Sequence, residues 1–348
     1  MKYHLVLNRP IDLDKITRDA IEGKCPRNVM AMLRDRLGAT VHMPGSHKVT
    51  AMDKIRSKLF GQPQIWAMAR ALRGRLSDGD VVFCNGEDTA VPVAVACSKR
   101  RGRPKLAMFA HNLDRPKARL ALKLYRVASR VDLIITNIAI QVEFLRRFLG
   151  LPNSRVRLIQ DQTDMKFFRP GPASPGKTRP IIVSVGLEQR DYRTLAEATH
   201  DLDVDVQISG FSADASIQSR AFPDTLPANM TRKFYEWPDL VQLYRNADIV
   251  VVSLFECKYS AGISTVMEAL SCRRPLVVTG TEGISEFLDP EGMRITPNGD
   301  AAGLRRAIVE LLENPSEAEA LADRGHALGR RHDSDRFTEE IAGYLASL

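Results

Sequence analysis

Short, almost wholly apolar runs alternate along this chain with longer stretches in which apolar residues recur at helical spacing. In the first half the apolar runs predict strands at 3–7, 39–42, 81–84, 105–110, 133–136 and 155–159. The intervening stretches predict helices at 29–37, 65–75, 90–99, 115–129 and 138–149. Apolar strands that alternate with helices are typical of parallel sheets covered on both faces.

The second half repeats this alternation after a stretch at 168–177 that is rich in proline and glycine, as linkers are. Its strands are predicted at 180–186, 204–209, 249–254, 275–279 and 293–295, and its helices at 192–199, 240–246, 264–272, 300–312, 315–328 and 334–346. We therefore predict an α/β protein with two doubly wound Rossmann-like domains facing across a cleft. The expected parts are an N-terminal domain at 1–170, a C-terminal domain at 171–330, and a C-terminal helix at 331–348 that packs back on the N-terminal domain.

The composition is that of a protein folded in water. Hydrophobic residues make up 44% of the 348 positions and charged residues 26%, and no apolar run approaches the roughly 20 residues that cross a bilayer. The first residues contain too short an apolar segment for a secretory signal. Five cysteines without a Cys-x-x-Cys pair argue against a disulfide framework and against a zinc site. We expect a cytoplasmic protein.

Positive charge is concentrated in the first half. Residues 1–170 contain 32 Lys and Arg against 15 Asp and Glu, a net +17, whereas residues 171–348 contain 18 against 27, a net −9. Such a surface attracts anionic lipid headgroups or nucleic-acid phosphates. Because the basic runs lack interleaved aromatic residues, we expect an anionic membrane surface and no nucleic acid. Residues 52–76 have a basic amphipathic pattern that suits a membrane; a helix pair packed on its own domain is the alternative.

One strand-to-helix connection carries the clearest candidate chemistry. The apolar strand at 249–254 is followed by a loop of small residues from Ser260 and by a helix that contains Glu268. The start of a helix presents unpaired N–H groups and a positive dipole, which suit a diphosphate, and Glu268 could bind ribose hydroxyls. An ordinary connection of an α/β protein explains the segment alone equally well.

Six segments, taken in order, resemble a known family. They are Phe109 to Asn112, Val131 to Asn137, Gln160 to Pro170, Val185 to Leu195, Ser260 to Glu268 and Thr281 to Glu286. In their order and spacing they resemble the retaining GT-B glycosyltransferases, in particular the family four type. The resemblance implies a retaining, metal-independent hexosyltransferase whose second domain binds a nucleotide-sugar donor and whose first domain binds an acceptor.

The resemblance also implies the residues of the site. Catalytic contacts would come from His111, Arg190, Glu256 and Ser260. Donor contacts would come from Gly186, Arg190, Gly262, Ile263, Ser264, Thr265 and Glu268. Arginine and helix amides can neutralise a departing diphosphate without a metal ion, so we expect no metal and no cofactor. The expected donor is a UDP- or GDP-sugar, and the expected acceptor is lipid-linked or a polysaccharide at the inner membrane face.

The chain departs from the family pattern at three places. Spacing puts Ser260 where the family has its first Glu, and the nearest acid, Glu256, lies twelve residues before Glu268. Leu187 takes the place of a second cation at the diphosphate, for which Arg193 is a candidate replacement. A Gly-Gly loop is absent after the first strand. These departures support a rival hypothesis, a non-catalytic GT-B-like protein that binds a membrane or a partner.

Other classes are less compatible with the sequence. The first strand is not followed by the Gly-x-Gly-x-x-Gly of a dinucleotide-dependent oxidoreductase, and no Gly-x-Ser-x-Gly of a serine hydrolase occurs. Acids with Asp-x-Asp spacing, at 12–14, 201–203 and 203–205, are interpreted as structural turns rather than metal ligands. A nucleotide-sugar epimerase or phosphorylase of the same architecture is the rival among enzymes.

Overall fold

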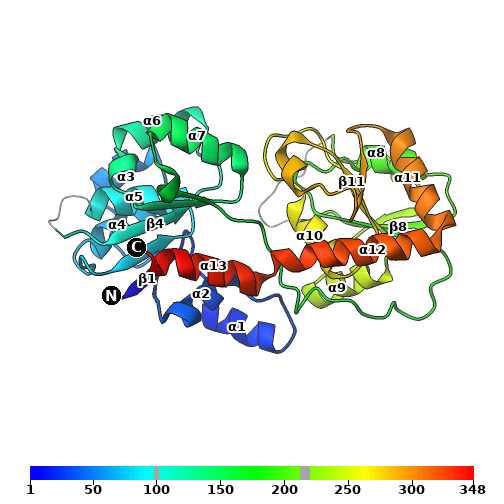
Figure 1. Cartoon of the computed structure of the whole chain (residues 1–348), viewed down its shortest axis with the longest axis horizontal. Coiled ribbons are helices and arrows are strands. Elements are labelled where there is room, and N and C mark those ends of the chain that lie inside the picture. The colour runs from blue at the N-terminus through cyan, green and yellow to red at the C-terminus, as the bar shows by residue number, and fades with distance from the viewer. Residues whose placement is uncertain (98–101, 212–219) are drawn as a thin grey trace. The chain divides into compact units, whose positions relative to one another are not determined.

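The chain forms two compact units (Figure 1). The structure, a computed structural model, describes residues 1–97, 102–211 and 220–348. The first unit consists of residues 1–18, 27–160 and 337–348, and the second of residues 19–26 and 161–336. The last two residues of the helix expected at 90–99, and the start of the basic run from Lys99, lie outside the described residues.

The first unit is built on six parallel strands in the order β2-β1-β3-β4-β5-β6. They are β1 (Tyr3–Val6), β2 (Thr40–His42), β3 (Val81–Cys84), β4 (Lys105–Phe109), β5 (Leu133–Thr136) and β6 (Val156–Leu158). Every residue of β3 and β5 is buried, because helices cover both faces of the sheet. The covering helices are α1 (Leu13–Ile21), α2 (Val29–Leu37), α3 (Ala51–Ser57), α4 (Pro63–Leu72), α5 (Glu87–Cys97), α6 (Pro116–Leu124), α7 (Ala139–Leu149) and the short η1 (Val127–Ser129) and η2 (Asn153–Arg155).

The C-terminal helix α13 (Ser334–Ala346) contributes to the core of this first unit. Its residues Ile341, Ala342 and Leu345 are buried in one apolar cluster with Leu5 of β1 and Leu33 of α2. Figure 1 shows α13, in red, alongside α2. The first sheet is therefore covered on one face by the end of the chain.

The second unit contains another sheet of six parallel strands, in the order β12-β11-β10-β7-β8-β9. Its strands are β7 (Ile181–Val185), β8 (Asp205–Ser209), β9 (Met230–Arg232), β10 (Ile249–Val252), β11 (Leu276–Thr279) and β12 (Arg294–Thr296). Its helices are α8 (Tyr192–Thr199), α9 (Trp237–Asn246), α10 (Ile263–Ser271), α11 (Ala301–Glu313), α12 (Pro315–Gly329), η3 (Glu282–Phe287) and η4 (Arg330–His332). The prediction of two parallel α/β domains with flanking helices is confirmed.

A few elements of the structure differ from those that the sequence predicted. The helix expected at 115–129 is divided into α6 and η1, because Arg126 has the left-handed φ of 49° that ends an α-helix. Helix α1 and strand β9 were not expected. Helix α1 does have apolar residues at helical spacing, Leu13, Ile16 and Ile21, and this signal was passed over, whereas β9 is only three residues long and too short to show a hydrophobic period. Among the described residues, no helix is long and apolar enough to cross a bilayer.

Candidate functional site

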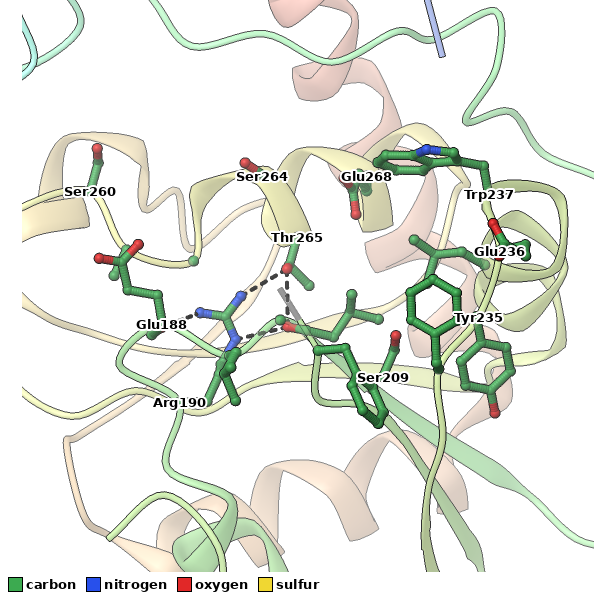
Figure 2. A pocket seen from close by; sticks show the side chains of 18 residues that line it. Glu188, Arg190, Ser209, Tyr235, Glu236, Trp237, Ser260, Ser264, Thr265 and Glu268 are labelled. Carbon is green, nitrogen blue, oxygen red and sulfur yellow. Dashed lines mark hydrogen bonds between the residues drawn. The ribbon is translucent and has the colours of Figure 1, made fainter. Parts of the chain in front are cut away.

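The strand order of the second sheet creates a crevice beside β7. From β7 the chain continues to β8 and β9, then returns so that β10 and β11 lie on the other side of β7. At such a switch point the loops after neighbouring strands diverge beyond the carboxyl ends of the strands. A cavity of about 800 Å³ lies there, lined by the ends of β7 and β8 and by the starts of α9 and α10 (Figure 2). Its volume is that of a small-molecule site.

Arg190 lies at the floor of this cavity and is 4% exposed. Its guanidinium donates hydrogen bonds to the carbonyl of Val185 at 2.8 Å, the carbonyl of Glu188 at 3.0 Å, and the Oγ1 of Thr265 at 2.8 Å. All three partners are neutral, and no ion pair of Arg190 occurs within the described ranges. A buried positive charge whose hydrogen-bond partners are all neutral is unusual, although this charge also acts on the Glu268 carboxyl, where it partly offsets the rise in pKa that burial causes. It makes the cavity a suitable place for an anion.

Two glycines allow close backbone packing in this cavity, Gly186 against the guanidinium of Arg190 and Gly262 against the end of β10. Gly186 has a φ of 102°, and a Cβ there would lie 2.4 Å from the Nη2 of Arg190. Gly262, the N-cap of α10, has a φ of 89°, and a Cβ there would lie 3.1 Å from Val252. A side chain at either position would strain the backbone and crowd its neighbours.

The first turn of α10 faces the cavity with its backbone N–H groups available. Among the described residues, no side chain caps this helix. Ser264 is exposed and Thr265 is buried, and both line the cavity. The hydroxyl of Thr265 donates to the carbonyl of Val185 at 3.1 Å while it accepts from Arg190. The positive end of the α10 dipole and the guanidinium are thus held together by one hydroxyl.

Glu268 lines the cavity on the next turn of α10. Burial of its side chain raises the pKa of this carboxyl to about 7. Its Oε2 accepts a hydrogen bond from the hydroxyl of Tyr244 at 2.6 Å, and burial raises the pKa of that tyrosine as well. Figure 2 shows Glu268 on the same side of the cavity as Trp237. A carboxyl group in this position can accept hydrogen bonds from ligand hydroxyls.

An aromatic wall forms another side of the cavity. It consists of Phe211, Phe234, Tyr235 and Trp237. The rings of Phe211 and Phe234 meet edge to face at 5.9 Å, and the guanidinium of Arg232 lies 4.7 Å from the ring of Phe211. Exposed aromatic faces of this kind bind planar ligands by stacking. The sequence contains a signal for this wall, because three of its four aromatic residues fall within 234–237. The signal was missed because β9, the strand that precedes these residues, was not predicted.

Comparisons with known proteins agree with this geometry. A family model described as glycosyl transferases group 1 matches residues 180–314, and a model described as Glycosyltransferase Family 4 matches residues 33–165. The chain is a glycosyltransferase of the GT-B type. Among curated protein sequences no significant match was found.

Solved structures of the same fold are similar to this glycosyltransferase over its whole length. HepE from Anabaena, solved with UDP-glucose, is 15% identical, covers 100% of both chains and has a TM-score of 0.69. Sucrose-phosphate synthase from Thermosynechococcus elongatus is 15% identical, with 100% and 99% coverage and a TM-score of 0.70. The α,α-trehalose 6-phosphate synthase from Burkholderia multivorans is 13% identical, with 99% and 98% coverage and a TM-score of 0.70. At such identities the likeness shows the fold.

The cavity of the glycosyltransferase brings together most residues expected at the donor. Its lining includes Gly186, Arg190, Ser260, Gly262, Ser264, Thr265 and Glu268. The side chain of Ile263 instead packs in the core. Glu256 is outside the lining, and its Oε1 accepts a hydrogen bond from the backbone N–H of Glu282 at 3.0 Å. Of the two alternatives for the first acid of the family, Ser260 is the one at the cavity.

The cations expected beside Arg190 are arranged differently. Leu187 is buried in the lining, and Arg193 is not among the lining residues. Arg193 donates to the carbonyl of Phe222 at 2.7 Å and pairs with Asp224 at 3.2 Å. Arg193 is therefore not placed as a replacement cation. Among the described residues that line the cavity, Arg190 is the one basic residue.

His111 follows β4 in the first unit and has an exposed ring 4.9 Å from that of Phe109. The loop after it is held by two buried polar side chains. The carboxylate of Glu87 accepts from the backbone N–H groups of His111 at 3.0 Å and Asn112 at 3.3 Å. The amide of Gln141 donates to the carbonyl of His111 and accepts from the N–H of Leu113 at 3.0 Å. This fixed loop lies at the carboxyl edge of the first sheet, where ligands bind in such folds.

Motifs for phosphate or metal binding elsewhere have structural explanations. Residues 171–178 match the Gly-x-x-x-x-Gly-Lys-Thr of a P-loop, a match that sequence reasoning missed, but no helix follows them and Lys177 pairs with Asp248 at 2.5 Å. Of the acids with Asp-x-Asp spacing, Asp12 caps α1 and Asp14 pairs with Arg34. The acids at 201, 203 and 205 pair with Arg305 or Arg179. Among the described residues, no group of three or more His, Cys, Asp or Glu could hold a metal ion.

Proposed function

We propose that this enzyme transfers a sugar from a nucleoside-diphosphate donor to an acceptor with retention of the anomeric configuration. The observation that carries the proposal is the buried guanidinium of Arg190, which has neutral partners and lies beside the uncapped start of α10. Both groups favour an anion with two negative charges close together. The complex of HepE with UDP-glucose supports the same class of donor.

The cavity has a place for each part of such a donor. The diphosphate would meet Arg190 and the amides of Ile263, Ser264 and Thr265, and the ribose hydroxyls would meet Glu268. The base would lie against the aromatic wall. Three acids, Glu188, Glu236 and Glu268, also line the cavity. These acids would bind hydroxyl groups of the donor rather than its phosphates. A UDP- or GDP-sugar fits this arrangement.

The reaction breaks the bond between the anomeric carbon and the diphosphate oxygen, which keeps the electron pair. The acceptor hydroxyl forms the new bond from the same face, and its proton passes to the departing phosphate oxygen. Because negative charge grows on the diphosphate during this step, Arg190 and the α10 amides stabilise the transition state more than the bound donor. These groups supply the required positive charge, so we propose a reaction that needs no metal ion or cofactor.

The acceptor is proposed to bind at the carboxyl edge of the first sheet. His111 stands there on a loop fixed by Glu87 and Gln141, and we propose that it contacts the transferred sugar or acceptor hydroxyls. The first unit includes the half of the chain with the excess of basic residues. A lipid-linked or polysaccharide acceptor at the cytoplasmic face of an anionic membrane fits this charge.

One observation favours a second candidate, a non-catalytic GT-B protein. Ser260 stands at the cavity in place of an acid, while Glu256 is bonded to the backbone of Glu282. Such a protein would bind the nucleotide without turnover. An epimerase would instead convert the donor without any acceptor.

The decisive experiment compares UDP-, GDP-, ADP- and dTDP-sugars as donors with a glycan acceptor and with lipid extracts. We expect calorimetry to show binding of one nucleoside diphosphate, and magnetic resonance of the product to show the same anomeric configuration as the donor. Inversion would contradict retention. Binding without hydrolysis or transfer for every donor would favour the non-catalytic candidate.

A further inference from the structure

The helices of the first unit leave apolar side chains in solvent on one surface. Met52 and Ile55 of α3 are 52% and 59% exposed, and Leu120 and Leu124 of α6 are 57% and 62% exposed. Met52 and Ile55 are three positions apart and Leu120 and Leu124 four, so each pair forms a stripe on its helix. Single exposed apolar residues are normal, but paired stripes indicate a binding surface.

The exposed positions around these stripes are basic. Lys54 and Lys58 flank the stripe of α3, and Lys117 and Lys123 flank that of α6. Helix α6 contains no acid. The one acid of α3, Asp53, is turned inward: it is 1% exposed, forms a capping box with Thr50, and pairs with Arg70 at 3.0 Å. The exposed charged side chains of both helices are therefore all basic. The other large side chains that they expose are apolar.

The two helices are joined through aromatic contacts into one surface. The guanidinium of Arg56 on α3 lies 5.4 Å from the ring of Trp66, and Trp66 lies 5.4 Å from Tyr125, the C-cap of α6. On the other side of α6, Lys123 lies 4.8 Å from the ring of Phe148 on α7. Trp66 is buried, so these contacts place α3 and α6 close to one another without adding the Trp66 ring to the surface.

The structure distinguishes the two helices of the segment at 52–76. The sequence pattern there left two interpretations open, helices that lie on a membrane and a helix pair packed on its own domain. In the structure the apolar residues of α4, including Ile65, Trp66 and Met68, are buried in the core, as the alternative interpretation held. Only α3 of that segment exposes its apolar residues, and its neighbour in the surface is α6.

We propose that the outer faces of α3 and α6, called the α3–α6 surface, dock on the headgroups of an anionic lipid bilayer. The leucine, isoleucine and methionine side chains would enter the interface between headgroups and acyl chains, and the lysines would contact lipid phosphates. This deepens the proposed function, because it places the acceptor unit where a lipid-linked acceptor would be. Docking itself requires no catalysis, so the two proposals can fail separately.

The test measures binding of the full-length protein to vesicles by flotation. One set of vesicles is pure phosphatidylcholine and another contains phosphatidylglycerol as well. We expect binding to the anionic vesicles only, and a loss of more than about 30-fold in affinity for the pair Lys54→Glu with Lys117→Glu, because removal of the two cations alone costs about 1 kcal/mol each and the new carboxylates add repulsion. The matched control is Arg306→Glu with Arg331→Glu, two exposed arginines of the second unit, which changes the net charge equally and should leave binding almost unchanged.

The apolar part is tested by Leu120→Ser with Leu124→Ser, for which we expect a loss of tenfold or more. The matched control is Ile21→Ser with Ile295→Ser, which removes exposed isoleucines elsewhere. Equal losses for the control and α3–α6 pairs, equal binding to neutral vesicles, or no binding to any vesicle would overturn the proposal. Binding to heparin as tight as to vesicles, and independent of the leucines, would show a site for soluble polyanions and also overturn it.

Donor hydrolysis by the same variants separates the two proposals. The four substituted residues of the α3–α6 surface are outside the donor cavity, so hydrolysis should be unchanged while vesicle binding falls. If vesicle binding occurs as expected but no donor is turned over, the docking surface stands and the proposed enzymatic function fails.

Discussion

In each unit a buried charged side chain fixes the loop that follows a strand of the sheet, but the charge of that side chain differs between the units. Each has a parallel six-stranded sheet with a functional loop beyond its carboxyl edge. In the second unit the loop after β7 is held by the guanidinium of Arg190, and in the first the loop after β4 is held by the carboxylate of Glu87. A buried cation leaves a site that attracts a diphosphate, whereas a buried carboxylate and an amide leave one suited to neutral hydroxyls. Under the proposed function, the charge of the group that anchors each loop matches the ligand proposed to bind there.

Replacing Arg190 should have the largest effect. In Arg190→Ala three hydrogen bonds and the positive charge are lost, so we expect kcat/KM for transfer to fall roughly 1,000-fold. Nucleoside-diphosphate affinity should fall about 10- to 100-fold and the free energy of unfolding by about 2–4 kcal/mol. Calorimetry and denaturant titration measure the two effects. Unchanged affinity in the folded variant would contradict the assignment, and Arg190→Lys, which keeps only a point charge, should be intermediate.

His111→Ala tests the other side of the comparison. We expect kcat to fall about 100-fold, because a polar group near the reacting sugar stabilises the transition state. Donor affinity should hardly change, since His111 is not a lining residue of the donor cavity and the described lining residues all come from the second unit. Steady-state kinetics alongside calorimetry checks this. A large loss of donor affinity with normal kcat would assign His111 to ground-state donor binding instead.

Glu87→Gln should have a smaller effect, because the amide keeps one acceptor for the two N–H groups that Glu87 now accepts. We expect kcat to fall about tenfold through misplacement of the His111 loop, corresponding to about 1–2 kcal/mol for a charge-assisted hydrogen bond. Combining Glu87→Gln with His111→Ala should add little to His111→Ala alone. Full additivity of the two losses would show that Glu87 acts independently of His111.

Titration of Glu268 should give the smallest effect. Its pKa is about 7 in the folded protein against an ordinary value of 4.5, so the folded state binds more protons between these values. The free energy of unfolding should therefore fall as pH rises from about 4.5 to 7, by about 1 kcal/mol when partial exposure is taken into account. Glu268→Gln should remove this part of the slope. A slope unchanged in that variant would show that another group titrates.

The sequence predicted the sheets well because buried parallel strands are continuous apolar runs. Ile249–Val252 and Leu133–Thr136 are buried throughout and were expected within two residues of their ends. The sequence also predicted that Gly262, Thr265 and Glu268 lie at one site, because a strand, a small-residue loop and a helix are adjacent in sequence, and these residues line the cavity. Strand β9 was missed because three residues are too few to show a hydrophobic period, whereas α1 was missed although its apolar residues recur at helical spacing.

Contacts between segments that are distant in the chain could not be predicted from the sequence. Glu268 accepts a hydrogen bond from Tyr244, twenty-four positions earlier, and the loop after His111 is held by Glu87 and Gln141 from two other helices. The same is true of the surface of the first unit, where α4 is buried and α3 and α6 are exposed. A periodic pattern gives each helix an apolar face, but it does not say whether protein or solvent covers it.

By itself, then, the sequence determined the alternation of strands and helices, the uneven charge, and the helix start that can hold an anion. Only the tertiary structure decided that Arg190 is buried among neutral partners, that Ser260 rather than Glu256 reaches the cavity, and which basic helices present apolar side chains to solvent. The physical reason is that hydrogen bonding and burial depend on groups brought together by folding, while periodicity and charge are properties of neighbouring residues.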